Sequence, residues 1–304
     1  MAAMKLFWRE QIRERDIDTL KSQLRAKLGG YRVAINYLTT DNLLFRGVVW
    51  DEPPRFTKDV SYPPANLVSK NGRLNRIGQA MFYGSRGAPA VFYETHAKKG
   101  QRVAVSTWEI IEPFWMHNVG YHEDALQRIG APLYGPRLKL AFPMANETRF
   151  NAQMRRQLSR AFTEDVEDGQ EYRYKLSIAI NELLFDGAEP LPTDIPDGPR
   201  CNRAGGTSYP AMQMRGAADN VAIWPEFVDR CLRLKSVSYG LVEAMDVKRQ
   251  SYTVSSLAMC NEFSGNELIW RNGIADERRR RGHIAFENGH WVMRDGLNEI
   301  YDIH

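Results

Sequence analysis

The chain has 304 residues, of which 43% are hydrophobic and 26% are charged, and its formal net charge is +4. The apolar fraction is enough for a real hydrophobic core, whereas no stretch approaches the roughly 20 apolar residues of a membrane span, which argues against a membrane-spanning protein. The N-terminus is charged and lacks the apolar core of a secretory signal, so we expect a cytoplasmic protein.

The first expected element is a helix over residues 5–29. Ile17, Leu20, Leu24 and Leu28 recur at spacings of three and four, which places them on one helical face. The glycine pair that follows is a suitable C-terminal stop. We expect this helix to pack against the body of the protein or to dock a partner.

Two strands are expected next, over residues 31–37 and 43–50, and the second contains a charge. Arg46 stands within the apolar run Leu43-Leu44-Phe45-Arg46-Gly47-Val48-Val49-Trp50. A charge inside an apolar strand costs free energy unless it is paired or binds something. Arg46 therefore lies either at a sheet edge, with its head in water, or in a ligand site. The strand context alone favours the edge.

A polar region follows the second strand. Residues 51–71 contain four prolines and few apolar positions, which is typical of a lid or a binding segment. They lead into Gly72-Arg73-Leu74-Asn75-Arg76-Ile77-Gly78, a loop with two glycines and two arginines. A short strand over residues 80–83 and a helix that begins near Pro89 come next. Glu94 lies on that helix among apolar neighbours.

The rest of the chain mixes strands and helices. Residues 102–111 alternate clearly and predict a strand, whereas residues 112–147 are expected to be loop-like with one short helix over 121–130. The other expected elements are helices over residues 147–162 and 171–185, a loop over 187–207, strands over 220–224, 232–241 and 248–258, and a hairpin-rich tail from residue 261.

Several kinds of site lack support in the motifs. The three cysteines form no CxxC pair and the six histidines show neither HxxxH nor HExxH spacing, so we expect no disulfide and no metal site. The absence of GxSxG, of a P-loop and of a strand-borne GxGxxG argues against serine hydrolases, ATPases and Rossmann dehydrogenases. The arginine run at residues 278–281 is interpreted as a solvated face, so nucleic-acid binding is not favoured.

Arg46, the loop over residues 72–78, Tyr83 and Glu94 remain as candidate chemistry. A carboxylate beside a ribose stabilises the positive charge that develops when a glycosidic bond breaks. A guanidinium holds a diphosphate through paired hydrogen bonds, and an aromatic face packs on a ring. Chemistry at a nicotinamide–ribose bond needs this small set. Each residue taken alone is more often structural, and Tyr83 in a strand is typical of a core position.

Four segments of this region resemble the RES domain family, within a match over about residues 40–240. The segments are Leu44-Phe45-Arg46-Gly47, the loop from Gly72 to Gly78, Met81-Phe82-Tyr83-Gly84-Ser85 and Ala90-Val91-Phe92-Tyr93-Glu94. The resemblance implies an α+β, ADP-ribosyltransferase-like fold, with a split mixed β core flanked by helices around an NAD cleft. It divides the chain into an N-terminal helical extension (1–30), the RES-like domain (31–245) and a small β-rich appendage (246–304).

The resemblance also implies roles for individual residues. Arg46 corresponds to the family arginine, Tyr83 to the aromatic residue of the strand and Glu94 to the family glutamate, and these three would be catalytic. NAD would be the substrate, with no separate cofactor. Its binding residues would be Arg46, Gly72, Arg73, Asn75, Gly78, Tyr83, Ser208 and Tyr209.

The sequence departs from the family at the serine. That residue is expected within Ser208-Tyr209-Pro210-Ala211-Met212, where Ala211 occupies its place. Ser208 lies three residues earlier and on a strand would face the opposite side from Ala211, so it is a weak substitute. Turnover is therefore expected to be slower, of a different type, or absent.

Characterised members of the family are NAD-degrading toxins of bacterial toxin–antitoxin systems. The resemblance thus implies an NAD phosphorylase or glycohydrolase with an antitoxin protein as its partner, and it leaves a homo-oligomer open. Two alternatives are an ADP-ribosyltransferase that acts on a macromolecule and an NAD-binding regulatory module that lost turnover with the serine. A nucleic-acid binder is a further alternative, although the arginine run lacks interleaved aromatic residues.

Overall fold

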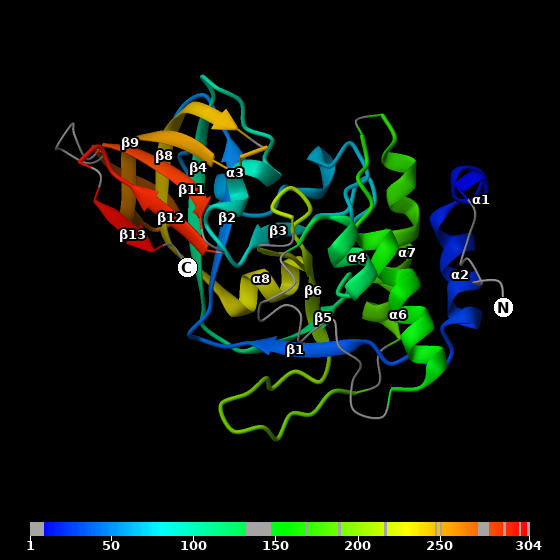
Figure 1. Ribbon diagram of the computed structural model, residues 1–304. Helices are drawn as coiled ribbons and strands as arrows, with labels where there is room; N and C mark the ends of the chain where they lie inside the picture. The colour runs from blue at the N-terminus through cyan, green and yellow to red at the C-terminus, as the bar shows by residue number, and fades with distance from the viewer. Residues whose placement is uncertain are drawn as a thin grey trace.

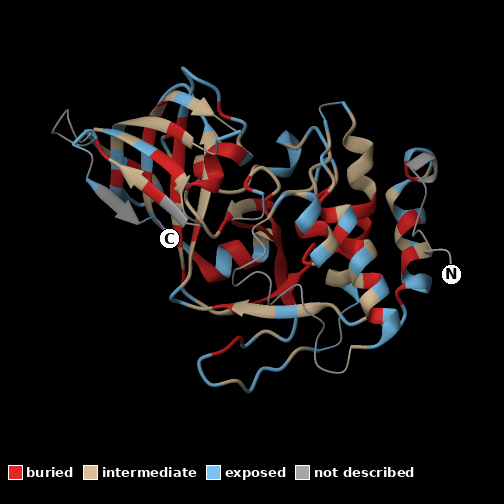
Figure 2. Ribbon diagram, viewed as in Figure 1, coloured by how far each residue is buried: buried red, intermediate tan, exposed pale blue. Residues whose placement is uncertain are grey.

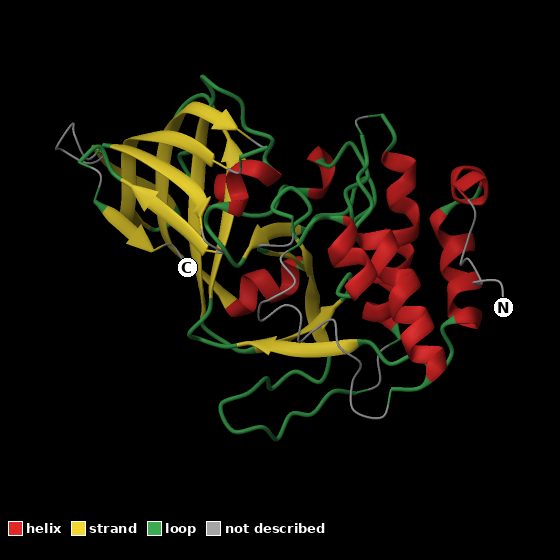
Figure 3. Ribbon diagram, in the orientation of Figure 1, coloured by secondary structure: helices red, strands yellow, loops and turns green. Residues whose placement is uncertain are grey.

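A mixed β-sheet is the frame of the molecule (Figures 1 and 3). The computed structural model describes residues 9–131, 147–167, 169–187, 190–215, 218–246, 248–249, 251–272, 280–287, 290–297 and 299–302. The strands in these residues are β1 (Ala34–Leu38), β2 (Leu43–Val49), β3 (Phe82–Ser85), β4 (Arg102–Ile110), β5 (Phe114–Asn118), β6 (Ala204–Pro210), β7 (Asp219–Ile223), β8 (Leu232–Asp246), β9 (Ser251–Ser264), β10 (Glu267–Asn272), β11 (Arg281–Glu287), β12 (His290–Arg294) and β13 (Ile300–Asp302).

These strands join into one sheet of the order β1-β5-β6-β7-β3-β2-β4-β8-β9-β11-β12-β13, with β10 paired to β9. The pair β5–β6 is parallel, and the other pairs are antiparallel. β3 and β2, which carry the candidate residues Tyr83 and Arg46, therefore lie in the middle of the sheet.

Helices flank the sheet. α2, α6 and α7 stand side by side at one end of the molecule, away from the C-terminal strands, whereas α3 lies against the sheet (Figure 1). The helices are α1 (Arg9–Glu14), α2 (Ile17–Lys27), α3 (Ala90–Glu94), α4 (Glu123–Arg128), α6 (Arg149–Phe162), α7 (Lys175–Asp186) and α8 (Pro225–Cys231), and the short 3-10 helices are η1 (Thr57–Val60), η2 (Ala65–Leu67) and η3 (Glu171–Tyr174).

The core is densest around the central strands. Every residue of β5, β6 and β7 is buried, and red marks these positions in Figure 2. One apolar cluster joins these strands to α8, a second joins α2, α6 and α7 to the sheet, and a third lies beneath α3. The α+β class predicted from the sequence is confirmed. None of the helices in the described residues combines the length and the apolar character that crossing a bilayer requires.

Two of the expected elements were wrong, and the loop expected over residues 187–207 ends earlier, because β6 begins at Ala204. The single helix over residues 5–29 is two helices in the described part, because Asp16 adopts an extended conformation and caps α2 by accepting a hydrogen bond from the Thr19 backbone N–H at 2.6 Å. β5 lies where a loop was expected. Its residues are buried on both faces, so it lacks the alternation by which a half-buried strand is recognised.

The C-terminal strands continue the same sheet and reach α3. β9 pairs with β8 across the position of residue 245, where the sequence predicts a domain boundary. Tyr252 of β9 is 1% exposed, and its ring lies 4.5 Å from that of Phe92 and 5.6 Å from that of Tyr93. The strand after the expected boundary thus supports the helix that carries Glu94.

Candidate functional site

A cavity of about 350 Å³ opens between the middle of the sheet, α3 and the segment that follows α6. Its wall contains six of the nine residues that the sequence assigns to the site. These six are Arg46, Gly72, Arg73, Tyr83, Glu94 and Tyr209. The structure therefore brings together residues as far apart in the chain as Arg46 and Tyr209.

Strand register explains why the central strands contribute to one wall. Tyr83 of β3 lies opposite Ala222 of β7, and Ser85 lies opposite Asn220. Asn220 in turn lies opposite Tyr209 of β6. Directly opposed residues of antiparallel strands share a face, so these side chains converge on the cavity.

Arg46 lies where β2 and β3 separate. The two strands pair at Phe45 and Ser85, and the guanidinium fills the gap beyond this point. Its Nη1 donates to Tyr83 O at 2.7 Å and its Nε donates to Ser61 O at 2.9 Å. Burial lowers the pKa of Arg46 to about 10, so the side chain stays charged at neutral pH. The edge position favoured by strand context is wrong, because β2 lies between β3 and β4.

The bonds of Arg46 limit how it can hold a ligand. A guanidinium has five N–H donors, and here two of them bind backbone carbonyls. The two-pronged edges of a guanidinium are Nε–Nη2 and Nη1–Nη2, and the Nε donor of the first edge is already used by Ser61 O. The remaining donors, mainly those of Nη2, are the ones that Arg46 can offer to a group in the cavity.

Glu94 is the last residue of α3, and the close approach of α3 to β2 places it. A Cβ on Gly47 would lie 2.8 Å from Thr95 Cγ2 and 3.2 Å from Val91 Cβ, so only glycine permits this packing. The preceding residues of α3, from Ala90 to Tyr93, are buried. Glu94 is the polar end of an apolar helix and faces the cavity.

The carboxylate of Glu94 has a raised pKa. It is accessible to solvent through the opening of the cavity, yet the surrounding walls displace enough water to raise the pKa of the group by burial. A hydrogen bond with the side chain of Asn220 and the charges of Arg73 and His96 act in the opposite direction. Within the described residues, no cation lies within ion-pair distance of Glu94.

The loop over residues 72–78 contributes a second guanidinium. Arg73 Nη1 donates to Phe162 O at 3.0 Å and to Glu164 O at 3.1 Å, which ties the loop to the end of α6. The guanidinium carbon lies 5.2 Å from the centre of the Tyr174 ring, within the range of a cation–π contact. Arg73 and Arg46 thus place two positive charges on the cavity wall.

Tyr83, Asn75 and Gly72 form one local unit. The Tyr83 hydroxyl donates to Asn75 Oδ1 at 2.7 Å and accepts from Leu74 N at 2.8 Å, and burial raises its pKa. A side chain on Gly72 would overlap Asn75 Oδ1 and lie 2.9 Å from the Tyr83 hydroxyl. The hydroxyl therefore makes its hydrogen bonds within the loop, and the ring of Tyr83 is the part that a ligand can contact. Asn75 supports the wall rather than forming it.

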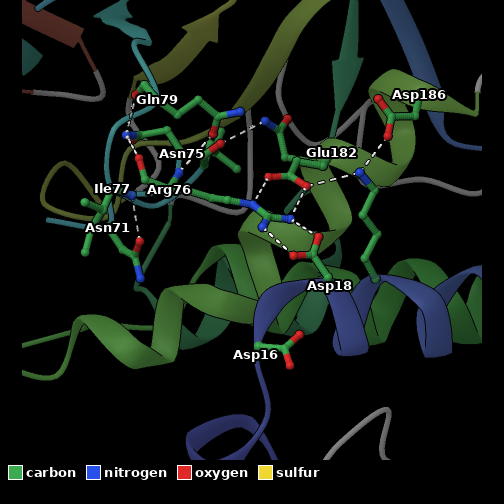
Figure 4. A network of polar contacts seen from close by, with 12 residues as sticks. Asp16, Asp18, Asn71, Asn75, Arg76, Ile77, Gln79, Glu182 and Asp186 are labelled. Carbon is green, nitrogen blue, oxygen red and sulfur yellow. Dashed lines mark hydrogen bonds and ion pairs between the residues drawn. The ribbon is translucent and has the colours of Figure 1, made fainter. Parts of the chain in front are cut away.

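Arg76 anchors the far side of the same loop to the helices (Figure 4). Its guanidinium donates to both carboxylate oxygens of Asp18 on α2, at 2.6 and 2.9 Å, and to those of Glu182 on α7, at 2.5 and 2.7 Å. Lys21 pairs with Glu182 at 3.1 Å and with Asp186 at 2.6 Å. The network holds the cavity loop against α2 and α7.

Three positions that the sequence singles out lie away from the cavity. Ser208 points to the opposite face of β6 from Tyr209, where its hydroxyl lies 3.2 Å from that of Tyr121. Gly78 has a φ of +74° and makes a turn, with its N–H donating to Val68 O at 2.9 Å. Ala211, where the resemblance predicts a serine, is fully buried in the apolar cluster beneath α3. The structure thus does not bring Ser208 or Gly78 to the site.

The cavity also contains residues that sequence reasoning missed. Asp165 and Tyr174 come from the segment after α6, Asn220 from β7 and Ser85 from the end of β3. Ser85 is 1% exposed, and its hydroxyl donates to Asp219 O at 3.0 Å. Asp165 and Tyr174 belong to no motif, and their position depends on how α6 packs. Ser85 stood within a quoted segment, two residues after Tyr83, and alternation would have placed it on the same face.

The walls therefore combine two guanidinium groups, tyrosine rings and the carboxylates of Glu94 and Asp165, neither of which has an ion-pair partner in the described residues. Such a lining favours an anionic ligand with a flat ring, beside which a positive charge can develop. In the residues that the structure describes, no group of three or more His, Cys, Asp or Glu side chains could hold a metal ion. No protein-family model matches the chain, and no curated protein matches it.

Proposed function

We propose that the protein consumes NAD by cleaving its nicotinamide–ribose bond. The observation that carries this proposal is the placement of Glu94 in a cavity whose walls also hold Arg46 and Arg73. NAD brings a diphosphate and a ribosyl–pyridinium bond, and these match two guanidinium groups and a carboxylate. The RES-like segments of the sequence supply the same residues independently of the cavity.

In this proposal each residue has one task. The free donors of Arg46 and the charge of Arg73 hold the diphosphate, while the ring of Tyr83 packs beside the nicotinamide. Glu94 stabilises the ribosyl cation that develops as nicotinamide leaves with the electron pair of the broken bond. Phosphate, water or a protein side chain then forms a bond to the ribosyl carbon as the acceptor. A toxin role with a cognate antitoxin belongs to the same proposal, on the basis of the sequence resemblance.

The test follows nicotinamide release from NAD by the purified protein, with and without phosphate. We expect release by the wild type and a loss of at least about a hundredfold in Glu94→Gln, because the variant keeps the shape but not the charge. Glu226→Gln is the matched control, since Glu226 is exposed and pairs with Arg203 on the surface. Release by Glu94→Gln at the wild-type rate contradicts the proposal.

A non-catalytic NAD-binding module is the second candidate. Two observations favour it: Ala211 offers no hydroxyl, and Ser208 points away from the cavity. Calorimetry with NAD separates the two candidates. Binding without nicotinamide release supports the regulatory module, whereas binding with release supports the enzyme.

A further inference from the structure

His96 lies two residues after Glu94 and lines the same cavity. Its backbone has a φ of +50°, in the left-handed region that residues other than glycine rarely adopt. Among the other non-glycine residues that the structure describes, only Asp197 and Arg215 have a positive φ. The backbone of His96 is therefore held in a conformation that costs free energy, and residues of this kind cluster at functional sites.

The way in which α3 ends imposes this conformation. The backbone N–H of His96 donates to Tyr93 O at 3.0 Å, and that of Ala97 donates to Phe92 O at 3.3 Å. These two bonds form a Schellman motif, in which the residue at the position of His96 is usually glycine. Glycine adopts a positive φ without the steric cost of a Cβ. Glycine would therefore end this helix at a lower cost than histidine does.

The imidazole of His96 is available to a bound molecule. It makes no hydrogen bond, ion pair or ring contact with the residues that the structure describes. His96 is exposed where it lines the cavity, so a ligand there can reach it. The Glu94 carboxylate lies nearby: burial raises its pKa, and the charge of His96 is among those that oppose this effect. A strained backbone thus carries a polar side chain that the described fold does not use.

We propose that His96 is a recognition residue of this site: the left-handed turn at the end of α3 presents the imidazole to the cavity, where a ring N–H donates a hydrogen bond to an oxygen atom of the ligand. The proposal rests on the proposed function, because the ligand used to test it is NAD. NAD offers such acceptors in its ribose hydroxyls, its carboxamide and its diphosphate. A neutral imidazole has one N–H donor and a charged one has two, so the bond is available in either form.

The first measurement is thermal unfolding without a ligand. His96→Gly removes the steric cost of the left-handed turn, so we expect a Tm equal to that of wild type or up to about 2 °C higher. Asp197→Gly is the matched control. Asp197 is exposed and has a φ of +54°, and it lies outside the cavity, in a turn where Gly198 N donates to Ile195 O at 3.0 Å. A Tm of His96→Gly clearly below wild type overturns the proposal, because the imidazole would then support the fold.

The second measurement is the affinity for NAD, determined by calorimetry at pH 7. We expect His96→Gly to bind NAD roughly tenfold more weakly than wild type, since it loses one hydrogen bond to the ligand. Asp197→Gly should bind NAD as tightly as wild type. The combination of an undiminished Tm and a weaker affinity separates a ligand contact from a structural role. An unchanged affinity of His96→Gly overturns the proposal.

The third measurement tests the contact itself. Ring-carbon NMR signals of labelled histidine are followed in wild type while NAD is added, and the His96 signal is assigned by its loss in His96→Gly. We expect this signal to shift as NAD binds. His283 is the matched control, because it is an exposed histidine of β11 outside the cavity, and its signal, assigned by its loss in His283→Gln, should not move. If NAD binds without moving the His96 signal, the proposal fails, because greater backbone freedom would then explain a weaker affinity of the glycine variant.

These measurements keep the role of His96 apart from the proposed function. If wild type binds NAD but releases no nicotinamide, cleavage is wrong, and the affinity and the NMR signal still decide the role of His96. If wild type cleaves NAD and His96→Gly binds it equally well, only the role of His96 is wrong. If wild type does not bind NAD, both proposals are wrong.

Discussion

Glu94 lowers the stability of the folded protein, and it also supplies a carboxylate to the cavity. The walls of the cavity raise its pKa, which means that the folded protein disfavours the charged form of this carboxylate. Active sites often hold groups whose surroundings cost stability. Tyr83 is the contrasting case, because its hydroxyl is fully used inside the loop and stabilises the wall.

Replacing Glu94 by glutamine should stabilise the protein at neutral pH. The folded pKa lies above the ordinary value of 4.5, so the free energy of unfolding falls as pH rises through the window between these two values and stays lower above it. Without the carboxylate, we expect the Tm at pH 7 to rise by roughly 1–3 °C, and the difference to vanish below about pH 4. Thermal unfolding of Glu94→Gln and of the control Glu226→Gln checks this. A Tm of Glu94→Gln at or below wild type at pH 7 contradicts it.

Removing the Tyr83 hydroxyl should have the opposite effect. Tyr83→Phe leaves Asn75 Oδ1 and Leu74 N without their partner inside a buried wall, so we expect a loss of about 1–3 kcal/mol in the free energy of unfolding. Tyr62→Phe is the control, because its hydroxyl bonds to Asp229 at an exposed position and its loss should cost less than about 1 kcal/mol. Urea unfolding of both variants distinguishes them, and equal losses would contradict the role given to Tyr83.

At the level of elements, the loop over residues 72–78 is held from two sides. Arg73 ties it to the end of α6, and Arg76 ties it to α2 and α7. The helix near the N-terminus therefore takes part in the site through Asp18, although it lies at the far end of the molecule (Figures 1 and 4). Because neither guanidinium can leave without exposing buried partners, we expect the loop to hold its shape in the absence of a ligand.

Arg76→Ala tests this anchoring. The Glu182 carboxylate, whose side chain is 9% exposed, would keep Lys21 as its remaining partner, and we expect unfolding to become easier by about 1–3 kcal/mol. Because the loop loses its support, NAD affinity should fall as well. Arg233→Ala, which breaks an exposed pair with Glu109, should cost less than about 1 kcal/mol and leave affinity unchanged. The idea fails if both variants bind NAD like wild type.

For the whole molecule, the continuity of the sheet matters most. Strands beyond residue 245 extend it, and β9 buries Tyr252 against the aromatic residues of α3. The C-terminal part thus supports the back of the helix whose end carries Glu94. A change in the packing of this part should reach the site through α3.

Tyr252→Ala is the corresponding prediction. The ring is almost fully buried, so its loss should lower the free energy of unfolding by about 3–5 kcal/mol. Leu257→Ala on the same strand is the control, because Leu257 is 38% exposed and its loss should cost less than about 1 kcal/mol. We also expect Tyr252→Ala to lower nicotinamide release at a temperature where the variant is folded. Full release by the folded variant would show that β9 does not support the site.

Local patterns in the sequence predicted the elements that carry the site. Arg46, Tyr83 and Glu94 lie on the strands and the helix expected for them, because each stands in or beside an apolar run whose period is readable. Tertiary packing decided the rest. The packing of α6 brings Asp165 and Tyr174 to the cavity, and the register of β7 brings Asn220 to it. Neither the packing nor the register can be predicted from a local sequence pattern. Ser208 illustrates the same limit, since only strand register shows which face it takes.

The gap between β2 and β3 has a practical consequence for the choice of a variant that tests the proposed function. Arg46 closes that gap with bonds to Tyr83 O and Ser61 O, so a substitution there removes two structural hydrogen bonds together with the contact that we propose for the ligand. Lysine would not replace it, because a single ammonium lacks the rigid fork that spans the two carbonyls. If an Arg46 variant releases no nicotinamide, either a damaged fold or a missing ligand contact explains the loss. If Glu94→Gln releases none and has a raised Tm, a damaged fold is not the explanation.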